Sequence, residues 1–300
     1  MIRVLVVGCG DVAMRAARIL GGRARLVGLT RRADETAKLR EHRIVPILGD
    51  LDDLRTLARL RAAPDAVLHF APPPPEGRGD PRTGRLVAAL SAARRIPRRF
   101  VYVSTTGVYG DCAGARVAET RPRHAQSPRA RRRVDAEDRL RAWAARNGVS
   151  LSILRAPGIY AQTRLPLERL RQGTPVLVPE HDVYTNHIHA DDLARSAVAA
   201  LFRARPNRAY HASDDSELRM GQWFDALADA HRLPRPPRVD WEEAETRIAP
   251  VLLSFMNESR RLSNDRLKRE LRVRLAYATP QAMLDASAAR DPKRQLPLAF

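Results

Sequence analysis

The stretch VLVVGCGDVAMRAARIL, residues 4–20, decides how the fold begins. An apolar run leads into the pattern Gly8-x-Gly10-x-x-Ala13, and apolar residues with helical periodicity follow directly. In such a turn the first glycine allows the tight bend, the second lets a pyrophosphate approach the backbone, and the third small residue lets the helix pack close to the strand. The N–H groups at the start of the helix then face the phosphates. The predicted cofactor-binding residues of this turn are Gly8, Gly10, Asp11, Val12 and Ala13.

The rest of the first half repeats this alternation of strand and helix. Apolar runs occur at residues 2–7, 25–30, 43–48, 65–70, 99–104 and 150–155, with helical patterns between them. This succession predicts the α/β class and a Rossmann-type doubly wound parallel sheet. We therefore expect an NAD(P)-binding domain at residues 1–156.

The pattern becomes irregular after Pro157, where we expect a smaller, substrate-facing part at residues 157–300. A helix over 190–202 and a strand over 208–213 are expected to pack back on the sheet, which would interweave the two parts. The charged tail, residues 290–300, is expected to be mobile because chain ends of this composition make few contacts.

Composition bounds the function classes. The net charge is +19, which raises the question of nucleic acid, but lysine occurs at only three positions, so 50 of the 53 basic residues are arginine. Such a skew is typical of genomic codon bias, and the arginines are spread along the whole chain. We therefore rank a specific nucleic-acid binder last. No apolar run approaches the roughly 20 residues of a membrane span. The two cysteines, Cys9 and Cys112, fit a reducing cytoplasm, and no metal-ligand spacing occurs.

The residues at the end of the second apolar run indicate which dinucleotide the chain prefers. An NAD site usually carries an acid there, which binds the ribose 2′-hydroxyl. This chain has Thr30, Arg31 and Arg32 instead, and its first acid is Asp34. Arginine forms bidentate, charge-assisted bonds to a 2′-phosphate. The sequence therefore favours NADP(H), with NAD(H) as the alternative.

Several further segments carry a family resemblance. They read ILGDLDD (47–53), AVLHFA (66–71) and VYVSTTGVYG (101–110). In combination with the glycine turn the chain resembles the extended and atypical short-chain dehydrogenase/reductases, the NAD-dependent epimerase/dehydratase group. The resemblance implies that Asp50 and Leu51 lie at the adenine, that Ala71 lies near the ribose and that Thr105 is the catalytic hydroxyl. It also implies a small-molecule substrate and a homodimer formed through two helices of the nucleotide half.

The helix over 128–147 departs from this family. The family carries Tyr-x-x-x-Lys there, and its following glutamate matches Glu137, so Arg133 stands at the lysine position and Arg129 at the tyrosine position. Arg133 can hold the nicotinamide ribose and pair with Glu137 one turn on. Arg129 cannot shuttle a proton, because its pKa exceeds about 12. We predict that Arg129 and Arg133 face the cofactor crevice and that Arg131 and Arg132 point away.

The missing tyrosine leaves the proton donor open. Substitute candidates, each with a purely structural alternative, are Tyr109, Tyr160, Tyr184, His187 and His189. Arg164 and Asn186 are candidates for contacting an anionic or polyhydroxy substrate. Two hypotheses rank ahead of the nucleic-acid binder: an NADP(H)-dependent oxidoreductase or epimerase-like enzyme for a carbonyl or sugar-derived substrate, and a non-catalytic dinucleotide binder that reports cofactor state.

Overall fold

A seven-stranded, wholly parallel sheet organises the computed structural model, which describes residues 1–62 and 64–290. Its strand order is β11-β7-β5-β4-β1-β2-β3, so the order reverses on either side of β1 as in a doubly wound fold. The strands are β1 Ile2–Val7, β2 Ala24–Thr30, β3 Ile44–Leu48, β4 Ala66–His69, β5 Arg99–Thr105, β7 Ser150–Ala156 and β11 Arg208–His211. The predicted α/β, Rossmann-type fold is confirmed.

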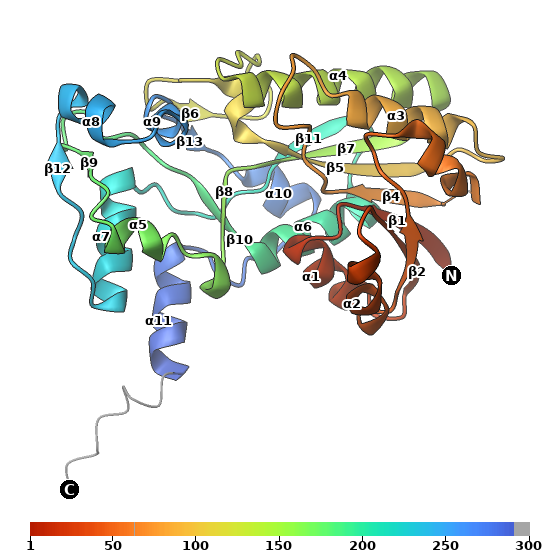
Figure 1. Cartoon of the computed structure of the whole chain (residues 1–300), viewed down its shortest axis with the longest axis horizontal. Coiled ribbons are helices and arrows are strands. Elements are labelled where there is room, and N and C mark those ends of the chain that lie inside the picture. The colour runs from red at the N-terminus through yellow and green to blue at the C-terminus, as the bar shows by residue number, and fades with distance from the viewer. Residues whose placement is uncertain (63, 291–300) are drawn as a thin grey trace, which may run out of the picture.

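Helices cover both faces of this sheet (Figure 1). One face carries α1 (Asp11–Leu20), α2 (Thr36–Glu41) and α6 (Ala190–Arg203), and the other carries the 3-10 segment η2 (Leu54–Ala62), α3 (Pro81–Ser91) and α4 (Pro128–Asn147). Along β1, Val4 and Val6 enter the first core, whereas Leu5 and Val7 enter the second. Because side chains alternate across a strand, two buried faces require the unbroken apolar run seen in the sequence.

Local sequence sets the bounds of α4. The Ser127 hydroxyl accepts a hydrogen bond from the Ala130 N–H at 3.3 Å, and Pro128 occupies the first turn. Gly148 ends the helix in the left-handed conformation with φ +63°. The predicted helix over 128–147 is therefore confirmed. The predicted strand over 208–213 is shorter and ends at His211, because the Asp214 carboxylate accepts bonds from the N–H and hydroxyl of Ser216 and turns the chain.

A separate core forms from the later residues. It joins α5 (Leu167–Arg171), α7 (Met220–His231), α8 (Trp241–Arg247), α9 (Pro250–Met256) and α11 (Pro280–Arg290). Two short strand pairs stiffen it: β8 (Gly158–Tyr160) with β10 (His187–His189), and β9 (Val176–Leu177) with β12 (Arg238–Val239). Figure 1 shows this part beside the carboxyl ends of the sheet strands.

The two halves of the chain are interwoven. β6 (Arg116–Val117) from the first half pairs with β13 (Arg261–Leu262), and α10 (Asp265–Glu270) packs on β11. Within residues 1–62 and 64–290 no helix combines the length and apolar character needed to cross a membrane. Most of the tail for which the sequence predicts mobility, residues 291–300, lies outside the described residues.

Candidate functional site

The turn between β1 and α1 needs glycine at its first position. Gly8 has φ +85°, and a Cβ there would lie 2.4 Å from the Ala71 backbone nitrogen. Gly10 is different, since a Cβ on it would meet nothing within 4 Å. Ala13 is buried in the core that α1 shares with the sheet. The turn therefore joins a tight backbone contact at Gly8 to open space at Gly10, where a phosphate can approach.

The start of α1 offers unused hydrogen-bond donors. No side chain caps the helix at Gly10, so the first N–H groups, which include those of Asp11 and Val12, lack intrahelical partners. The Asp11 carboxylate forms ion pairs with Arg15, whose Nε lies 2.9 Å away, and with Arg164, whose Nη1 lies 3.6 Å away. Arg164, a substrate-contact candidate, thus forms an ion pair at the cofactor turn. Uncapped N–H groups at the positive end of a helix are suited to hold a pyrophosphate.

The end of β2 holds an acid that the sequence did not suggest. Thr30 donates its hydroxyl hydrogen to Glu35 at 2.8 Å, and Arg32 forms two hydrogen bonds to Asp34. Arg31 is exposed, and no hydrogen bond holds it within the described part of the chain. Of the two arginines predicted to bind a 2′-phosphate, Arg32 is already paired, whereas Arg31 is available. Glu35 was missed because the short 3-10 segment η1 (Ala33–Glu35) folds it back toward β2.

Cys9 lies inside the glycine turn. Burial, with a smaller effect of the Glu35 carboxylate, raises the pKa of its thiol to about 12. The group therefore stays protonated near neutral pH, and a thiol is a poor nucleophile. This supports a packing role for Cys9.

The remaining predicted cofactor residues follow the next strands at the same edge. Asp50 comes after β3, and its carboxylate accepts the Asp52 N–H at 2.9 Å. Leu51 is buried in the core beneath η2 and α3. Ala71 comes after β4 and donates its N–H to the Val7 carbonyl at 3.1 Å. All of them therefore lie at the carboxyl edge that begins with the glycine turn.

Thr105 ends β5 at this edge and is half-buried. Its hydroxyl oxygen accepts the Gly107 N–H at 3.3 Å, and the hydroxyl hydrogen, which has no acceptor among the described residues, can donate. Arg133 reaches the same strand from α4 and donates to the Tyr102 hydroxyl at 3.0 Å and the Val103 carbonyl at 2.8 Å. The predicted pair between Arg133 and Glu137 is wrong, because Glu137 is directed to other partners.

Glu137 forms a buried ion pair with Arg155. Arg155 donates to both carboxylate oxygens of Glu137, from Nε at 3.1 Å and from Nη2 at 2.7 Å, and Ser104 donates at 2.7 Å. Burial alone raises the pKa of Glu137, but the hydrogen bonds and charge of Arg155 lower it below its ordinary value. The pair joins α4, β5 and β7, and so fixes the helix that carries Arg133.

Among the other arginines of α4, Arg132 is placed differently from the prediction. Arg132 was expected to point away from the apolar face, but it is 7% exposed and donates to the Gly77 carbonyl at 3.0 Å. The loop after β4 folds over this side of the helix and buries it. Arg129 lies over the Phe255 ring of α9, with Cζ 4.1 Å from the ring centroid. It therefore links the start of α4 to the C-terminal part.

The substitute acid/base candidates are mostly engaged in the core. Tyr109 accepts from Arg155 at 2.6 Å, and its hydroxyl is 2.6 Å from His211 Nε2. His211 Nδ1 lies 2.8 Å from the Ser263 carbonyl. A carbonyl only accepts, so Nδ1 carries the hydrogen and Nε2 accepts the Tyr109 hydroxyl. This assignment leaves Tyr109 in a structural role and His211 neutral.

The other candidates are constrained as well. His187, His189 and Tyr160 are each at most 5% exposed, and burial lowers the pKa of His187 to about 3. Asn186 donates to the Arg260 carbonyl at 2.9 Å and accepts from Leu262 at 3.1 Å. Its amide therefore holds two backbone segments together and is not free for substrate.

The neutral state of His211 predicts acid sensitivity. Burial lowers its pKa to about 3, and an unfolded histidine titrates near 6.5. Below about pH 6.5 the unfolded state binds the extra proton, so this histidine removes about 1.4 kcal/mol of stability per pH unit. Urea unfolding at pH 7.5 and pH 5.5 gives the unfolding free energy lost between these two pH values. This loss should be about 1.4 kcal/mol smaller in His211→Gln than in the wild type. Equal differences in both proteins would contradict the assignment.

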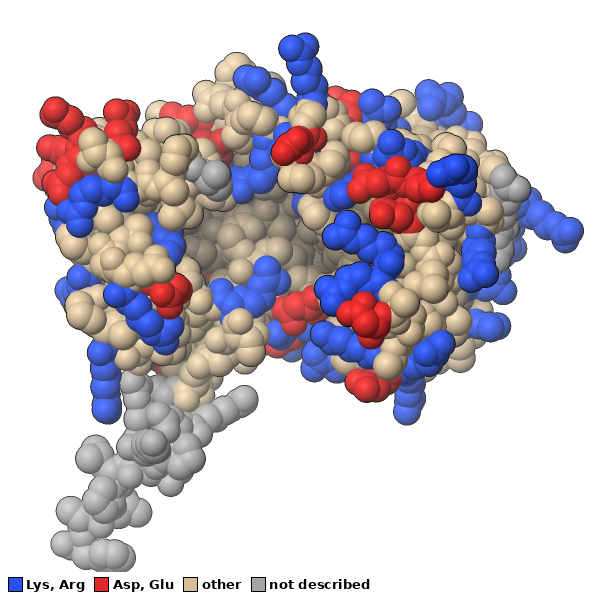
Figure 2. Space-filling model, viewed as in Figure 1, with Lys and Arg blue, Asp and Glu red and all other residues tan. Residues whose placement is uncertain are grey.

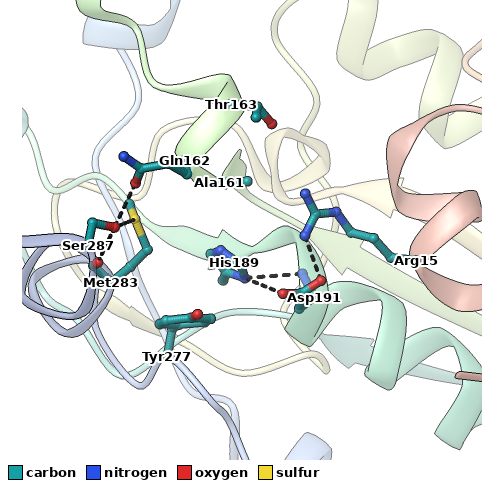
Figure 3. Close-up of a pocket in the computed structure, with 9 residues that line it drawn as sticks. All are labelled: Arg15, Ala161, Gln162, Thr163, His189, Asp191, Tyr277, Met283 and Ser287. Carbon is teal, nitrogen blue, oxygen red and sulfur yellow. Dashed lines mark hydrogen bonds and ion pairs between the residues drawn. The ribbon is translucent and has the colours of Figure 1, made fainter. Parts of the chain in front are cut away.

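The carboxyl edge borders a hollow in the surface. Figure 2 shows it between the sheet half and the C-terminal part, with basic side chains at its rim. A concavity of about 340 Å³ lies where α1, η4 (Gln162–Arg164), α6 and α11 meet. Figure 3 shows Arg15 and Asp191 paired at one side and Tyr277 beneath His189. No group of three or more His, Cys, Asp or Glu side chains in the described part is arranged for a metal ion.

Comparison with known proteins agrees with this arrangement. A model of the NAD dependent epimerase/dehydratase family matches residues 9–212. A dTDP-glucose 4,6-dehydratase from Mycobacterium tuberculosis (strain CDC 1551 / Oshkosh) is 29% identical over 191 residues, which cover 57% of this chain and 57% of that protein. The matched stretch thus spans little more than half the length of the curated relative.

Solved structures match over nearly the whole chain. A functionally unknown conserved protein from Silicibacter pomeroyi DSS is 30% identical with TM-score 0.78, covering 96% of this chain and 99% of that one. A DesIV double mutant (dTDP-glucose 4,6-dehydratase) from Streptomyces venezuelae with NAD and DAU bound is 22% identical with TM-score 0.75, covering 94% and 96%. A UDP-glucuronic acid 4-epimerase from Bacillus cereus in complex with NAD is 16% identical with TM-score 0.72, covering 95% and 99%. The last two support the fold alone.

Proposed function

The chain belongs to the NAD-dependent epimerase/dehydratase family, and from this premise we propose that it is an NAD(P)-dependent oxidoreductase or epimerase-like enzyme that acts on a carbonyl or sugar-derived small molecule. The observation that carries the proposal is the glycine turn. Gly8 closes against Ala71, Gly10 leaves open space, and the start of α1 is uncapped. In our proposal residues 1–156 bind the dinucleotide and residues 157–300 face the substrate, in a cytoplasmic homodimer.

The residues take the following roles in this proposal. Bound nicotinamide supplies hydride transfer to or from a substrate carbon. Thr105 donates its free hydroxyl hydrogen to the substrate oxygen, and this bond strengthens as negative charge develops there. Arg133, held by Tyr102 and Val103, keeps further N–H donors for the nicotinamide ribose. Asp50, Leu51 and Ala71 would line the adenosine half of the site.

The proposal includes a preference for NADP(H), which rests on Arg31. Its exposed guanidinium has no hydrogen bond in the described residues and can take a 2′-phosphate. Glu35 argues for NAD(H), because its carboxylate lies at the end of β2 and can accept from a ribose hydroxyl. At this strand end Arg31 favours NADP(H) and Glu35 favours NAD(H). A direct comparison of the two affinities decides between them.

A non-catalytic binder remains the second candidate function. It is favoured by the absence of the Tyr-x-x-x-Lys pair from α4, where Arg129 and Arg133 stand. Positioned acid/base catalysis contributes roughly 10²–10⁴-fold to a rate. A binder would hold NAD(P) and exchange no hydride with any member of a panel of carbonyl compounds and nucleotide sugars.

Substitution of Thr105 tests the enzymatic proposal. We expect Thr105→Ala to lower turnover at least about 100-fold, a size typical of losing one donor to a developing oxyanion. Its affinity for the dinucleotide should stay within about twofold, because in this proposal the Thr105 hydroxyl binds the substrate oxygen and not the dinucleotide. Thr105→Ser restores the hydroxyl and should recover most of the activity. Turnover of Thr105→Ala equal to the wild type, measured by absorbance at the NAD(P)H band, would remove Thr105 from the reaction.

A further inference from the structure

Four guanidinium groups gather around the start of α4. Arg129, Arg132 and Arg133 come from the helix, and Arg260 comes from the segment before β13. Desolvation lowers the pKa of Arg129, and the charges of the other three lower it further against the opposite effect of Glu258. Among the groups that shift the pKa of Arg129, Glu258 is thus one carboxylate against three guanidinium groups, so the surroundings of Arg129 carry an excess of positive charge.

Most of these groups already have protein partners. Arg132 donates to the Gly77 carbonyl, Arg133 donates to Tyr102 and Val103, and Arg260 donates to the Gly110 carbonyl at 2.6 Å and to Glu258 at 2.8 Å. These bonds place the cluster at fixed positions around the end of β5. They use neutral acceptors for the most part, so they orient the cations without balancing their charge.

Two donor sets are left over. Arg129 stacks on Phe255 and has no hydrogen bond or ion pair to any described residue. Arg260 is only 8% exposed, and its Nε has no acceptor among the described residues. Buried donors are normally paired, and buried cations normally meet an anion. Arg260 is buried, so its unpaired Nε indicates a missing anionic group, and the exposed Arg129 fork has donors free to bind that group.

The position of the cluster connects it to the reaction. Ala130, the next residue after Arg129, packs on the turn at Gly107, whose N–H is held by the Thr105 hydroxyl. The bonds of Arg133 to the Val103 carbonyl and of Arg260 to the Gly110 carbonyl hold the cluster on either side of the Thr105 turn in the sequence. A guanidinium fork matches the two oxygens of a carboxylate or phosphate group.

We propose that Arg129, with Arg133 and Arg260, forms a subsite for a carboxylate or phosphate group carried by the substrate next to its reacting carbon. That the anion belongs to a substrate rests on the proposed function, whereas the anion subsite itself does not. In this arrangement Arg129 binds and orients the substrate. It takes no part in proton transfer.

Anion binding to variants of α4 tests the subsite. The purified chain, saturated with NADP⁺ in 150 mM NaCl, is titrated calorimetrically with inorganic phosphate and, separately, with malonate. We expect Arg129→Gln to weaken the preferred anion roughly tenfold or more, as for a charge-assisted hydrogen bond. Arg129→Lys keeps the charge without the fork and should fall between Arg129→Gln and the wild type. The stronger of the two probes identifies a carboxylate or a phosphate as the natural group.

Arg131→Gln is the matched control. Arg131 lies on the same helix, is exposed and donates only to the Ala125 carbonyl at 3.4 Å, so its loss changes the net charge equally. Anion affinity should stay within about twofold in this variant. Equal weakening in Arg129→Gln and Arg131→Gln, or no anion binding by the wild type, would overturn the subsite. If the wild-type chain binds neither NADP⁺ nor NAD⁺ but still binds the anion through Arg129, the proposed function is overturned and the subsite is not.

Discussion

Replacing Gly8 with alanine is expected to destabilise the fold by roughly 3 kcal/mol or more, the combined size of overpacking and an unfavourable positive φ. The added Cβ would lie 2.4 Å from the Ala71 nitrogen and 2.7 Å from its Cα, and both are backbone atoms of the neighbouring strand end. Neither atom can turn aside as a flexible side chain does. Either β1 and β4 separate at their carboxyl ends or the turn changes shape, and the dinucleotide site is lost in both cases.

Gly10→Ala is the matched control for this prediction. A Cβ there meets nothing, and the φ of −83° suits alanine, so stability should change by less than about 1 kcal/mol. Dinucleotide affinity should nevertheless fall roughly tenfold or more, since the methyl group occupies the space left for the pyrophosphate. Urea unfolding and calorimetric titration of both variants separate the two effects. Wild-type stability in Gly8→Ala, or wild-type affinity in Gly10→Ala, would contradict the account of the turn.

The second large effect is expected at Glu137. Its side chain is fully buried, and Arg155, which it neutralises, is 3% exposed. Glu137→Gln keeps the shape but leaves the guanidinium charge buried without its counter-ion, a change that costs roughly 3–5 kcal/mol. Because the pair joins α4 to β5 and β7, the loss also loosens the support of Arg133. We expect a lower midpoint of urea unfolding and weaker dinucleotide binding in the same variant.

Asp138→Asn provides the comparison for Glu137→Gln. Asp138 is the next residue on α4 and pairs with Arg123 at 2.7 Å, but its side chain is 53% exposed. An exposed ion pair is worth about 0–1 kcal/mol, so this variant should unfold within that margin of the wild type. Similar midpoints for the Glu137 and Asp138 variants would show that the buried pair does not stabilise the fold as described.

The sequence predicted the sheet and the main helices because their signals are local. The unbroken apolar run of β1 follows from burial on both faces, and the bounds of α4 follow from Ser127, Pro128 and Gly148. The glycine turn was recognisable because its spacing has a backbone cause. Gly8 shows that cause directly, as a positive φ and a close contact with another strand.

The contacts of the charged residues could not be predicted from periodicity. Glu137 pairs with Arg155 from β7, 18 residues away, in preference to Arg133 one turn before it. Arg132 is buried by a loop 55 residues earlier in the chain. A helical pattern reports which face is apolar, but long guanidinium side chains choose among acceptors that only the tertiary fold brings near.

Calorimetric titration of the wild-type chain with NADPH, and separately with NADH, at physiological salt tests the central claim most directly. The account predicts one dinucleotide site per chain, tighter binding of NADPH than of NADH because of Arg31, and loss of that site in Gly10→Ala. Tighter binding of NADH would show that Glu35, and not Arg31, sets the cofactor preference at the end of β2. Binding of neither dinucleotide would contradict the claim that the glycine turn of this family member holds a cofactor.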